Sequence, residues 1–139
     1  MAVYTSINDS SAQFQTALWT GDGNSTQAIT NDGNSNLQPD FVWLKRRNGA
    51  ENHTLADTSR GVTKRVSSNN DAAEDTNGIA SVQSDGFTVS LSYNGNANGF
   101  TYVGWQWKVN GGTTASNTSG TTNVTTQVNS AAGVSIITG

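Results

Sequence analysis

Short apolar segments separated by clusters of Gly, Asn and Asp, about one cluster every ten residues, most constrain how this chain can fold. Gly, Asn and Asp adopt positive φ angles at little cost, so these clusters predict turns. The apolar segments between them predict strands at 14–20, 25–30, 41–46, 53–57, 62–66, 79–82, 87–91 and 101–109. Such spacing is typical of an antiparallel sandwich or barrel. We therefore predict an all-β fold, an antiparallel, jelly-roll-like β-sandwich.

Alternation of residue type along the expected strands indicates which side chains fill the interior. In the segment 101–108, Val103, Trp105 and Trp107 fall on one face, and we expect that face to be the core. The segment 41–46 starts with four apolar residues and ends in basic ones, which is typical of a central strand whose end emerges into solvent. The predicted core consists of Phe14, Leu18, Trp19, Phe41, Trp43, Leu44, Phe87, Val89, Val103, Trp105 and Trp107.

The two ends of the chain depart from this strand pattern. Near the N-terminus, Asn8 or Asp9 could cap one short helical turn, the only helix that we expect. Residues 111–133 are rich in Thr, Ser, Asn and Gly, and they carry too little apolar surface to offset the entropy of ordering, which predicts a linker or extended arm. We thus expect a sandwich domain over residues 1–110 and a terminal strand over 134–139 that could open a second module or pair with a neighbouring subunit.

Composition and charge narrow the classes of function. The net charge of −3 argues against nucleic-acid binding, because such binding needs many Lys and Arg residues to neutralise phosphates. The absence of Cys excludes disulfides and thiolate metal sites. No run of about 18 apolar residues occurs, and the first residues lack the basic and apolar regions of a signal peptide. We expect neither membrane insertion nor Sec-type export.

No arrangement of catalytic residues stands out. His53, Asp57 and Ser59 are the residue types of a catalytic triad, but their short spacing and the lack of a nucleophile elbow favour a structural histidine. A glycosidase needs two carboxylates at a defined separation, whereas the Asp residues here lie mostly in turn clusters. Five turn residues carry side-chain oxygens that could ligate Ca²⁺, namely Asp22, Asn24, Asp32, Asn34 and Asn36. Turn chemistry explains these residues better. We expect no catalytic residue, cofactor or metal.

Two further groups of residues each have two interpretations. Six of the seven basic residues lie close together in the sequence, namely Lys45, Arg46, Arg47, Arg60, Lys64 and Arg65. They either form ion pairs, with Arg60 bound to Asp57 or Asp40, or present a positive patch that contacts a partner protein or an anionic glycan. The four Trp residues either fill the core, which their alternation favours, or are exposed and stack on sugar rings.

Five segments resemble a domain of unknown function that recurs in virion and tail-fibre-like proteins of tailed phages, particularly marine and cyanobacterial ones. They are FQTALWTGDGN (14–24), QPDFVWLKRR (38–47), DTSRG (57–61), SDGFTV (84–89) and YVGWQWK (102–108). The resemblance carries over, without any catalytic role, to Asp40, Trp43, Lys45, Arg47, Asp57, Arg60, Trp105 and Trp107. The sequence departs from the family pattern at Leu37 and Gln106, where an aromatic residue and a Cys are common.

The resemblance implies a non-enzymatic structural protein of a phage virion, assembled in the host cytoplasm and forming part of a tail fibre or another surface appendage. Its implied partners are other copies of itself, with a trimer as one form, and other virion proteins. Two alternatives stay open. A capsid decoration protein would use the same sandwich to contact the shell, and a lectin-like module would bind a host-surface glycan through exposed aromatic and Asn side chains.

Overall fold

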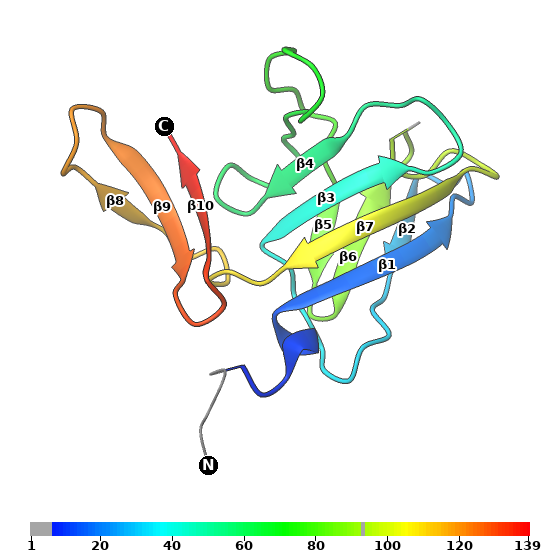
Figure 1. The fold of residues 1–139 in the computed structure, drawn as a ribbon. Coiled ribbons are helices and arrows are strands. Elements are labelled where there is room, and N and C mark those ends of the chain that lie inside the picture. Colours follow the sequence, from blue (N-terminus) through cyan, green and yellow to red (C-terminus); the bar gives the residue numbers. More distant parts are fainter. Residues whose placement is uncertain (1–6, 93) are drawn as a thin grey trace.

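The computed structural model describes residues 7–92 and 94–139, which form three antiparallel β-sheets (Figure 1). The first sheet has the order β1 (Phe14–Thr20), β7 (Thr101–Trp107), β3 (Phe41–Arg46) and β4 (Thr54–Asp57). The second has the order β2 (Thr26–Ile29), β6 (Gly86–Ser90) and β5 (Ser81–Gln83). The third, here called the C-terminal sheet, has the order β10 (Val134–Thr138), β9 (Val124–Asn129) and β8 (Ala115–Asn117). No helix among these residues is long and apolar enough to cross a membrane.

The hydrophobic core lies between the four-stranded sheet and the sheet formed by β2, β6 and β5. Its buried members are Ala17, Ile29, Val42, Leu44, Ala56, Ile79, Phe87 and Val89. Trp19 packs against this cluster, with its ring edge-on to Phe87 at a centroid distance of 5.7 Å. Two antiparallel sheets thus enclose one apolar layer, which confirms the predicted all-β sandwich.

The face of β7 that fills this core is the opposite of the predicted one. Tyr102 and Gln106 are completely buried, and Gly104 lies between them on the inner face. Trp105 and Trp107 point to the outer face and are only partly buried. The interior has little room for a side chain here, because a Cβ on Gly104 would lie 3.0 Å from the Phe87 ring. The alternation was predicted correctly, but the inner and outer faces were exchanged.

Four other residues of the predicted core lie on the outer face of the same sheet. Phe14 and Leu18 of β1 are 40% and 63% exposed, and Phe41 and Trp43 of β3 are partly buried. Strand pairing explains this placement, since the register sets Phe14 and Phe41 directly opposite Trp107. Residues opposite each other in neighbouring strands share one face, so all of these side chains follow the outward direction of β7.

The N-terminal helical turn is confirmed, whereas one predicted strand is absent. The 3₁₀ turn η1 (Ser10–Ala12) is capped by Asp9, whose carboxylate accepts a hydrogen bond from the backbone N–H of Ser11. The segment 62–66, expected to be a strand, contains only two residues that form isolated bridges. The remaining predicted strands in the sandwich match observed ones, with ends that differ by at most two residues.

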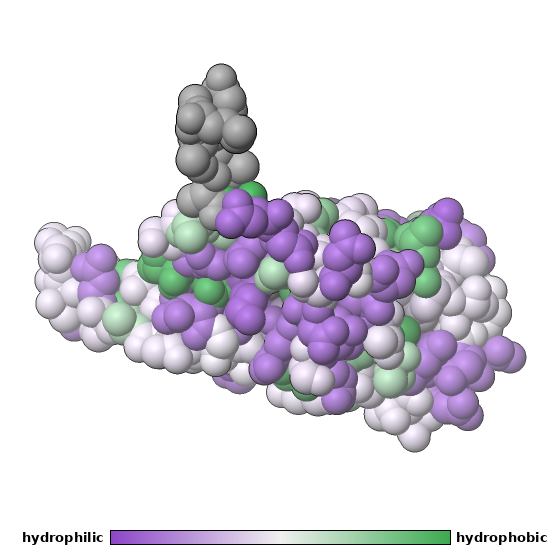
Figure 2. Space-filling model, turned by 90° about the horizontal axis from the view of Figure 1, so that it is seen from below, coloured by the Kyte–Doolittle hydropathy of each residue, from purple (hydrophilic) through white to green (hydrophobic). Residues whose placement is uncertain are grey.

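Residues 111–133, for which we expected a linker or extended arm, contain strands. They contain β8 and β9, and β9 pairs with β10 so that Gln127 lies opposite Ile136. The terminal strand predicted at 134–139 is therefore present, and it pairs within its own chain. Residues 109–139 contain no Asp, Glu, Lys, Arg or aromatic residue. In Figure 2 the C-terminal sheet extends to the left as a mostly pale surface, while strongly hydrophilic residues gather over the sandwich.

A buried carboxylate holds the start of this C-terminal region against the sandwich. Asp40, only 1% exposed, accepts hydrogen bonds from the backbone N–H groups of Val109 (2.7 Å) and Gly111 (3.0 Å). Its other oxygen accepts one from the hydroxyl of Thr58 at 3.0 Å. Asp40 therefore joins the segment before β3, the loop after β4 and the segment after β7.

Gln127 forms a second buried connection, from β9. Its side-chain oxygen accepts hydrogen bonds from the backbone N–H groups of Asn110 (3.0 Å) and Gly112 (3.1 Å). Its amide group donates to the hydroxyls of Thr58 (3.0 Å) and Ser59 (2.9 Å). These polar contacts, together with those of Asp40, order a region whose composition alone predicts little burial.

Candidate functional site

The outer face of the four-stranded sheet carries two complete cross-strand rows of side chains. One row consists of Phe14, Trp107, Phe41 and Asp57, and the other of Thr16, Trp105, Trp43 and Leu55. Directly opposite residues on one face of antiparallel strands are close enough to interact. We call the five aromatic residues of these rows the aromatic face; they are Phe14, Phe41, Trp43, Trp105 and Trp107.

The rings of the aromatic face contact one another at tilted or edge-on angles. The ring centroid of Trp107 lies 4.9 Å from that of Phe14 and 5.2 Å from that of Phe41. Trp43 lies 5.8 Å from Trp105 with an interplanar angle of 66°, and its indole N–H donates to Nδ1 of His53 at 2.7 Å. Such pairs stabilise the sheet and fix the orientation of each ring.

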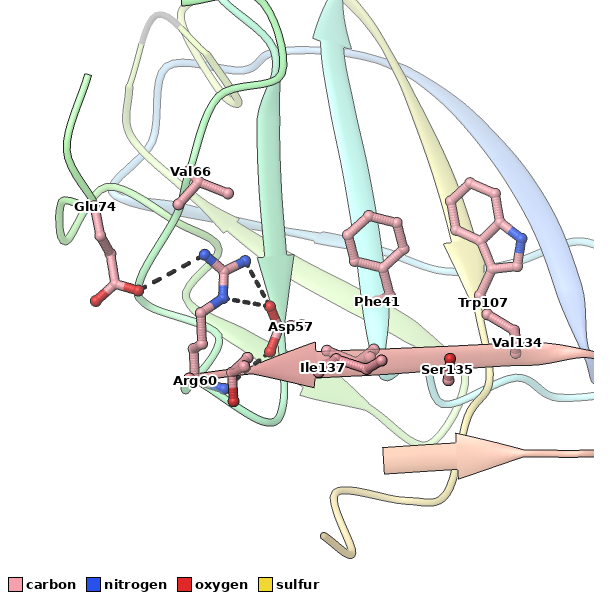
Figure 3. A pocket seen from close by; sticks show the side chains of 12 residues that line it. Phe41, Asp57, Arg60, Val66, Glu74, Trp107, Val134, Ser135 and Ile137 are labelled. Atoms are coloured by element: carbon pink, nitrogen blue, oxygen red, sulfur yellow. Dashed lines mark hydrogen bonds and ion pairs between the residues drawn. The ribbon is translucent and has the colours of Figure 1, made fainter. Parts of the chain in front are cut away.

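A pocket of about 570 Å³ lies between the aromatic face and β10 (Figure 3). It opens to solvent and has both an aromatic and a charged part. Phe41 and Trp107 line it from adjacent strands of the sheet, and β10 lies across their base in Figure 3. The lining side chains used below are Phe41, Asp57, Arg60, Glu74, Trp107 and Ile136, with the hydroxyl residues Ser135 and Thr138.

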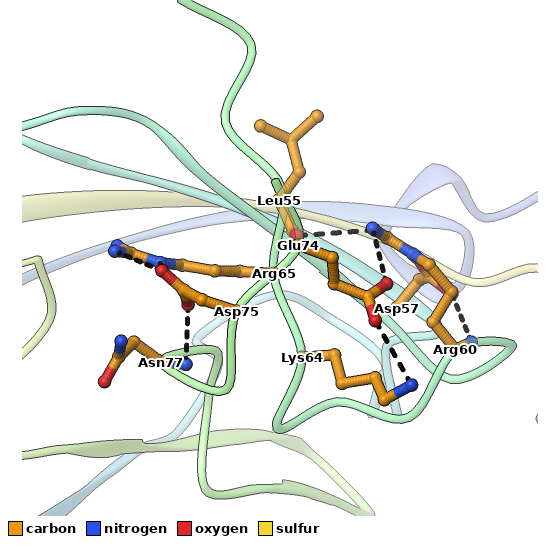
Figure 4. A network of polar contacts seen from close by, with 8 residues as sticks. All are labelled: Leu55, Asp57, Arg60, Lys64, Arg65, Glu74, Asp75 and Asn77. Carbon is orange, nitrogen blue, oxygen red and sulfur yellow. Dashed lines mark hydrogen bonds and ion pairs between the residues drawn. The ribbon is translucent and has the colours of Figure 1, made fainter. Parts of the chain in front are cut away.

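The charged part of the pocket is a chain of ion pairs (Figure 4). The carboxylate of Asp57, only 2% exposed, binds the guanidinium of Arg60 through Nε at 2.6 Å and Nη2 at 2.5 Å. Glu74 approaches Arg60 Nη1 at 3.6 Å and binds Lys64 at 3.1 Å. The Arg60–Asp57 pair is one of the two pairings that the sequence left open. Asp57, Arg60 and Glu74 line the pocket, and Lys64 pairs with Glu74 from outside the lining, so the charges of the four side chains balance within this chain of ion pairs.

The other members of the predicted basic patch are also held by partners within the chain. Arg65 binds Asp75 at 2.9 Å, and the hydrogen bonds from Arg65 are the main reason that the pKa of Asp75 is lowered. Arg46 pairs with Glu51 at 3.4 Å, and its guanidinium lies over the ring of Phe100.

One lysine and one arginine of the predicted patch form no ion pair with a described residue. The ammonium group of Lys45 donates to the backbone carbonyls of Arg46 and Gly49. Arg47 is exposed at the end of β3. Of the six predicted patch residues, four are therefore neutralised locally, and whether the group contacts a partner remains a prediction.

The three residues with the types of a catalytic triad have separate partners. His53 accepts the hydrogen bond from Trp43, Asp57 is bound to Arg60, and the Ser59 hydroxyl accepts from Gln127. Their side chains serve three different contacts, and the structure does not join them in one hydrogen-bonded array.

The turn residues considered as Ca²⁺ ligands serve local hydrogen bonding. Asp22 accepts from the backbone N–H of Asn24 at 2.8 Å and from the side-chain amide of Asn96 at 2.8 Å. These bonds lower the pKa of Asp22. Within residues 7–92 and 94–139, no three His, Cys, Asp or Glu side chains gather as a metal site would require.

Sequence reasoning did not find the pocket, because its lining comes from segments far apart in the chain. Glu74 belongs to an acidic loop that reads as solvated, and Ile136 to the short terminal strand. Of the lining residues, the family motif singled out Asp57, Arg60 and Trp107, and the predicted core included Phe41. Their shared location is a finding of the structure.

Comparisons with known proteins identify a family but no characterised relative. No curated protein and no solved structure matches the chain. A family model described as "Domain of unknown function (DUF7483)" matches residues 9–139, which includes the sandwich and the C-terminal sheet. The resemblance to a domain of unknown function is thus confirmed, and the chain belongs to the DUF7483 family.

Proposed function

We propose that this chain is a non-enzymatic structural protein of a phage virion, part of a tail fibre or another surface appendage. It assembles there with copies of itself and with other virion proteins. The sequence segments that resemble virion and tail-fibre-like proteins support the location. The geometry of the C-terminal sheet supports the assembly.

The edge strand β10 is the observation that carries the assembly proposal. Among the described residues, β10 pairs with β9 on one side and with no strand on the other. Its sequence, VSIIT, contains no charged residue and no Pro, and Ile137 is 63% exposed. Natural proteins usually block a free edge with charged residues or Pro, because a free edge can add a strand from another chain. An unblocked edge therefore favours pairing with a neighbouring copy.

In this proposal the free edge of β10, rather than an extended arm, pairs with a neighbouring subunit. Residues 115–117 and 124–129 already pair within the chain, so they are not free to extend into a neighbour. Pairing through β10 instead leaves each subunit intact. It would bring the C-terminal sheets of neighbouring subunits together, in a dimer, a trimer or a longer assembly.

Light scattering of the purified chain during size-exclusion chromatography tests the assembly proposal. We expect an oligomer for the unmodified protein and a monomer for Ile137→Lys, because a charge on the edge strand opposes strand addition. Val128→Lys is the matched control: Val128 is also exposed but lies on the central strand β9, so this variant should remain oligomeric. A monomeric unmodified protein at all accessible concentrations would contradict self-assembly.

Mass spectrometry and electron microscopy of purified phage particles test the proposed location. Antibody labelling or a resolved map should place the chain on a tail fibre or appendage. Labelling confined to the head surface would instead support the capsid decoration protein. Absence of the chain from the particles would contradict both.

A further inference from the structure

The pocket beside β10 has the size and lining of a small-molecule site. Its volume of about 570 Å³ lies within the range of such sites. Phe41 and Trp107 provide adjacent aromatic rings, tilted by 34° at a centroid distance of 5.2 Å. Rings that are partly exposed in a pocket offer an apolar surface to a flat ligand.

The charged part of the pocket offers a hydrogen-bond donor and an acceptor side by side. Asp57 holds Arg60 through Nε and Nη2, which leaves Nη1 directed at Glu74 over 3.6 Å. This separation exceeds a normal hydrogen-bond length, so Nη1 and the facing oxygen of Glu74 can each bind another group. Two neighbouring hydroxyls of one ligand would fit this pair, one accepting from Arg60 and the other donating to Glu74.

The charge balance of the pocket favours a neutral ligand. The charged lining side chains are Asp57, Glu74 and Arg60, and Lys64 pairs with Glu74 from outside the lining, so an acidic ligand would meet no unpaired positive charge. The hydroxyls of Ser135 and Thr138 add neutral polar groups to the lining. A suitable ligand has an apolar face, adjacent hydroxyls on its rim and no net charge.

We propose that this pocket binds a neutral pyranose ring of a glycan. The C–H face of the sugar lies against Phe41 and Trp107, and two adjacent hydroxyls bind Arg60 and Glu74. Ile136 of β10 contacts the ring from the side of the C-terminal sheet. Each subunit contains the complete pocket, but the site shares β10 with the assembly proposed above, because residues 134–139 all line it.

Binding to immobilised glycans, followed by titration calorimetry, tests the proposal with the full chain. The neutral probes are maltotriose, lactose, cellotriose and fucosyllactose, and the acidic probes are sialyllactose and trigalacturonate. We expect binding to at least one neutral probe, with quenching of Trp fluorescence. No binding to any neutral probe, or binding to acidic probes alone, would overturn the proposal.

Two pairs of variants locate the bound sugar. Phe41→Leu should weaken binding about tenfold, whereas Phe14→Leu should leave it unchanged, because both rings contact Trp107 but only Phe41 lines the pocket. Thermal unfolding checks that both variants fold. Equal loss in both would place the sugar elsewhere on the aromatic face and overturn the assignment.

The second pair separates the hydrogen-bond role of Glu74 from its ion pair. Glu74→Ala removes the acceptor and should weaken binding about tenfold, since hydrogen bonds to charged groups are the stronger ones. Lys64→Ala removes the same Lys64–Glu74 ion pair but leaves Glu74 and Arg60 in place, so binding should be retained. Unchanged binding by Glu74→Ala would overturn the proposed contact.

Discussion

Asp40 connects three segments of the chain through one buried carboxylate, and its removal should be costly. Asp40→Ala would leave the backbone N–H groups of Val109 and Gly111 without their acceptor. The N–H of Val109 is buried, and a buried donor that loses its partner costs about 1–3 kcal/mol. We therefore expect the free energy of unfolding to fall by about 3 kcal/mol in urea denaturation.

Asp32→Asn is the control for this variant, because Asp32 is an exposed turn carboxylate. It should change the free energy of unfolding by less than about 0.5 kcal/mol, as surface substitutions usually do. Equal effects of the two substitutions would mean that Asp40 contributes no more than an exposed turn residue.

The ion pair between Arg65 and Asp75 makes one loop contact sensitive to acid. Hydrogen bonds from Arg65 lower the pKa of Asp75 from its usual value of 3.8. A lowered pKa in the folded state adds stability above the usual value, and this contribution is lost as the pH falls through the folded-state pKa. We expect an NMR titration of the side-chain carboxyl to give a midpoint below 3.8.

Arg65→Gln tests the cause of this shift. It removes the positive charge and the guanidinium donors, so the Asp75 midpoint should return toward its usual value. An unchanged midpoint would assign the shift to the other hydrogen bond of Asp75, which comes from the backbone N–H of Asn77.

The strand β7 depends on one small residue in its inner face. A Cβ on Gly104 would lie 3.0 Å from Phe87, 3.1 Å from Leu44 and 3.2 Å from Trp19. Gly104→Ala should therefore overpack the core and reduce the free energy of unfolding by about 1–3 kcal/mol, measured by denaturant unfolding. Adding Phe87→Leu should relieve part of this loss, because it removes the nearest ring.

Gly120→Ala provides the comparison for this prediction. A Cβ there would meet only ordinary contacts, at 3.7 Å or more. Its stability should match that of the unmodified protein. If Gly104→Ala were equally harmless, the sheets would have room to move apart, and the close contact at β7 would not explain which face is buried.

Alternation and turn chemistry predict the elements of the sandwich well, but they do not identify the inner face of a strand. Trp105 and Trp107 are the largest residues of β7, yet the inner face has little room at Gly104 and accepts Gln106, whose amide donates to Asn31 at 2.6 Å. This choice depends on the distance between the two sheets. Local sequence carries no information about that distance, so the prediction exchanged the two faces.

Contacts between distant segments of the chain produce the features that the sequence did not predict. Residues 111–133 carry little apolar surface, but Gln127 and Asp40 bind the backbone near their start and help to order them. The pocket likewise depends on how β10 lies against β3 and β7. Composition describes each segment separately, and these features appear only when the segments meet.

The distribution of charge gives a prediction for the assembled protein. The last charged side chain in the sequence is that of Lys108, so the C-terminal sheet contains none. Contacts through β10 should therefore persist when ionic strength is raised, because screening acts only on charges. Sedimentation velocity in low salt and in about 1 M salt should give the same oligomer. Dissociation in high salt would indicate a contact through the charged sandwich instead.

A joint made by an uncharged strand has a further consequence for where such a protein can work. Its strength depends on backbone hydrogen bonds and buried methyl groups, so neither fresh water nor brine should loosen it. The protonation of the ionisable side chains of the sandwich could then change with the surrounding solution without weakening this joint. The C-terminal sheet would maintain the assembly, while the charged sandwich would respond to the surrounding solution.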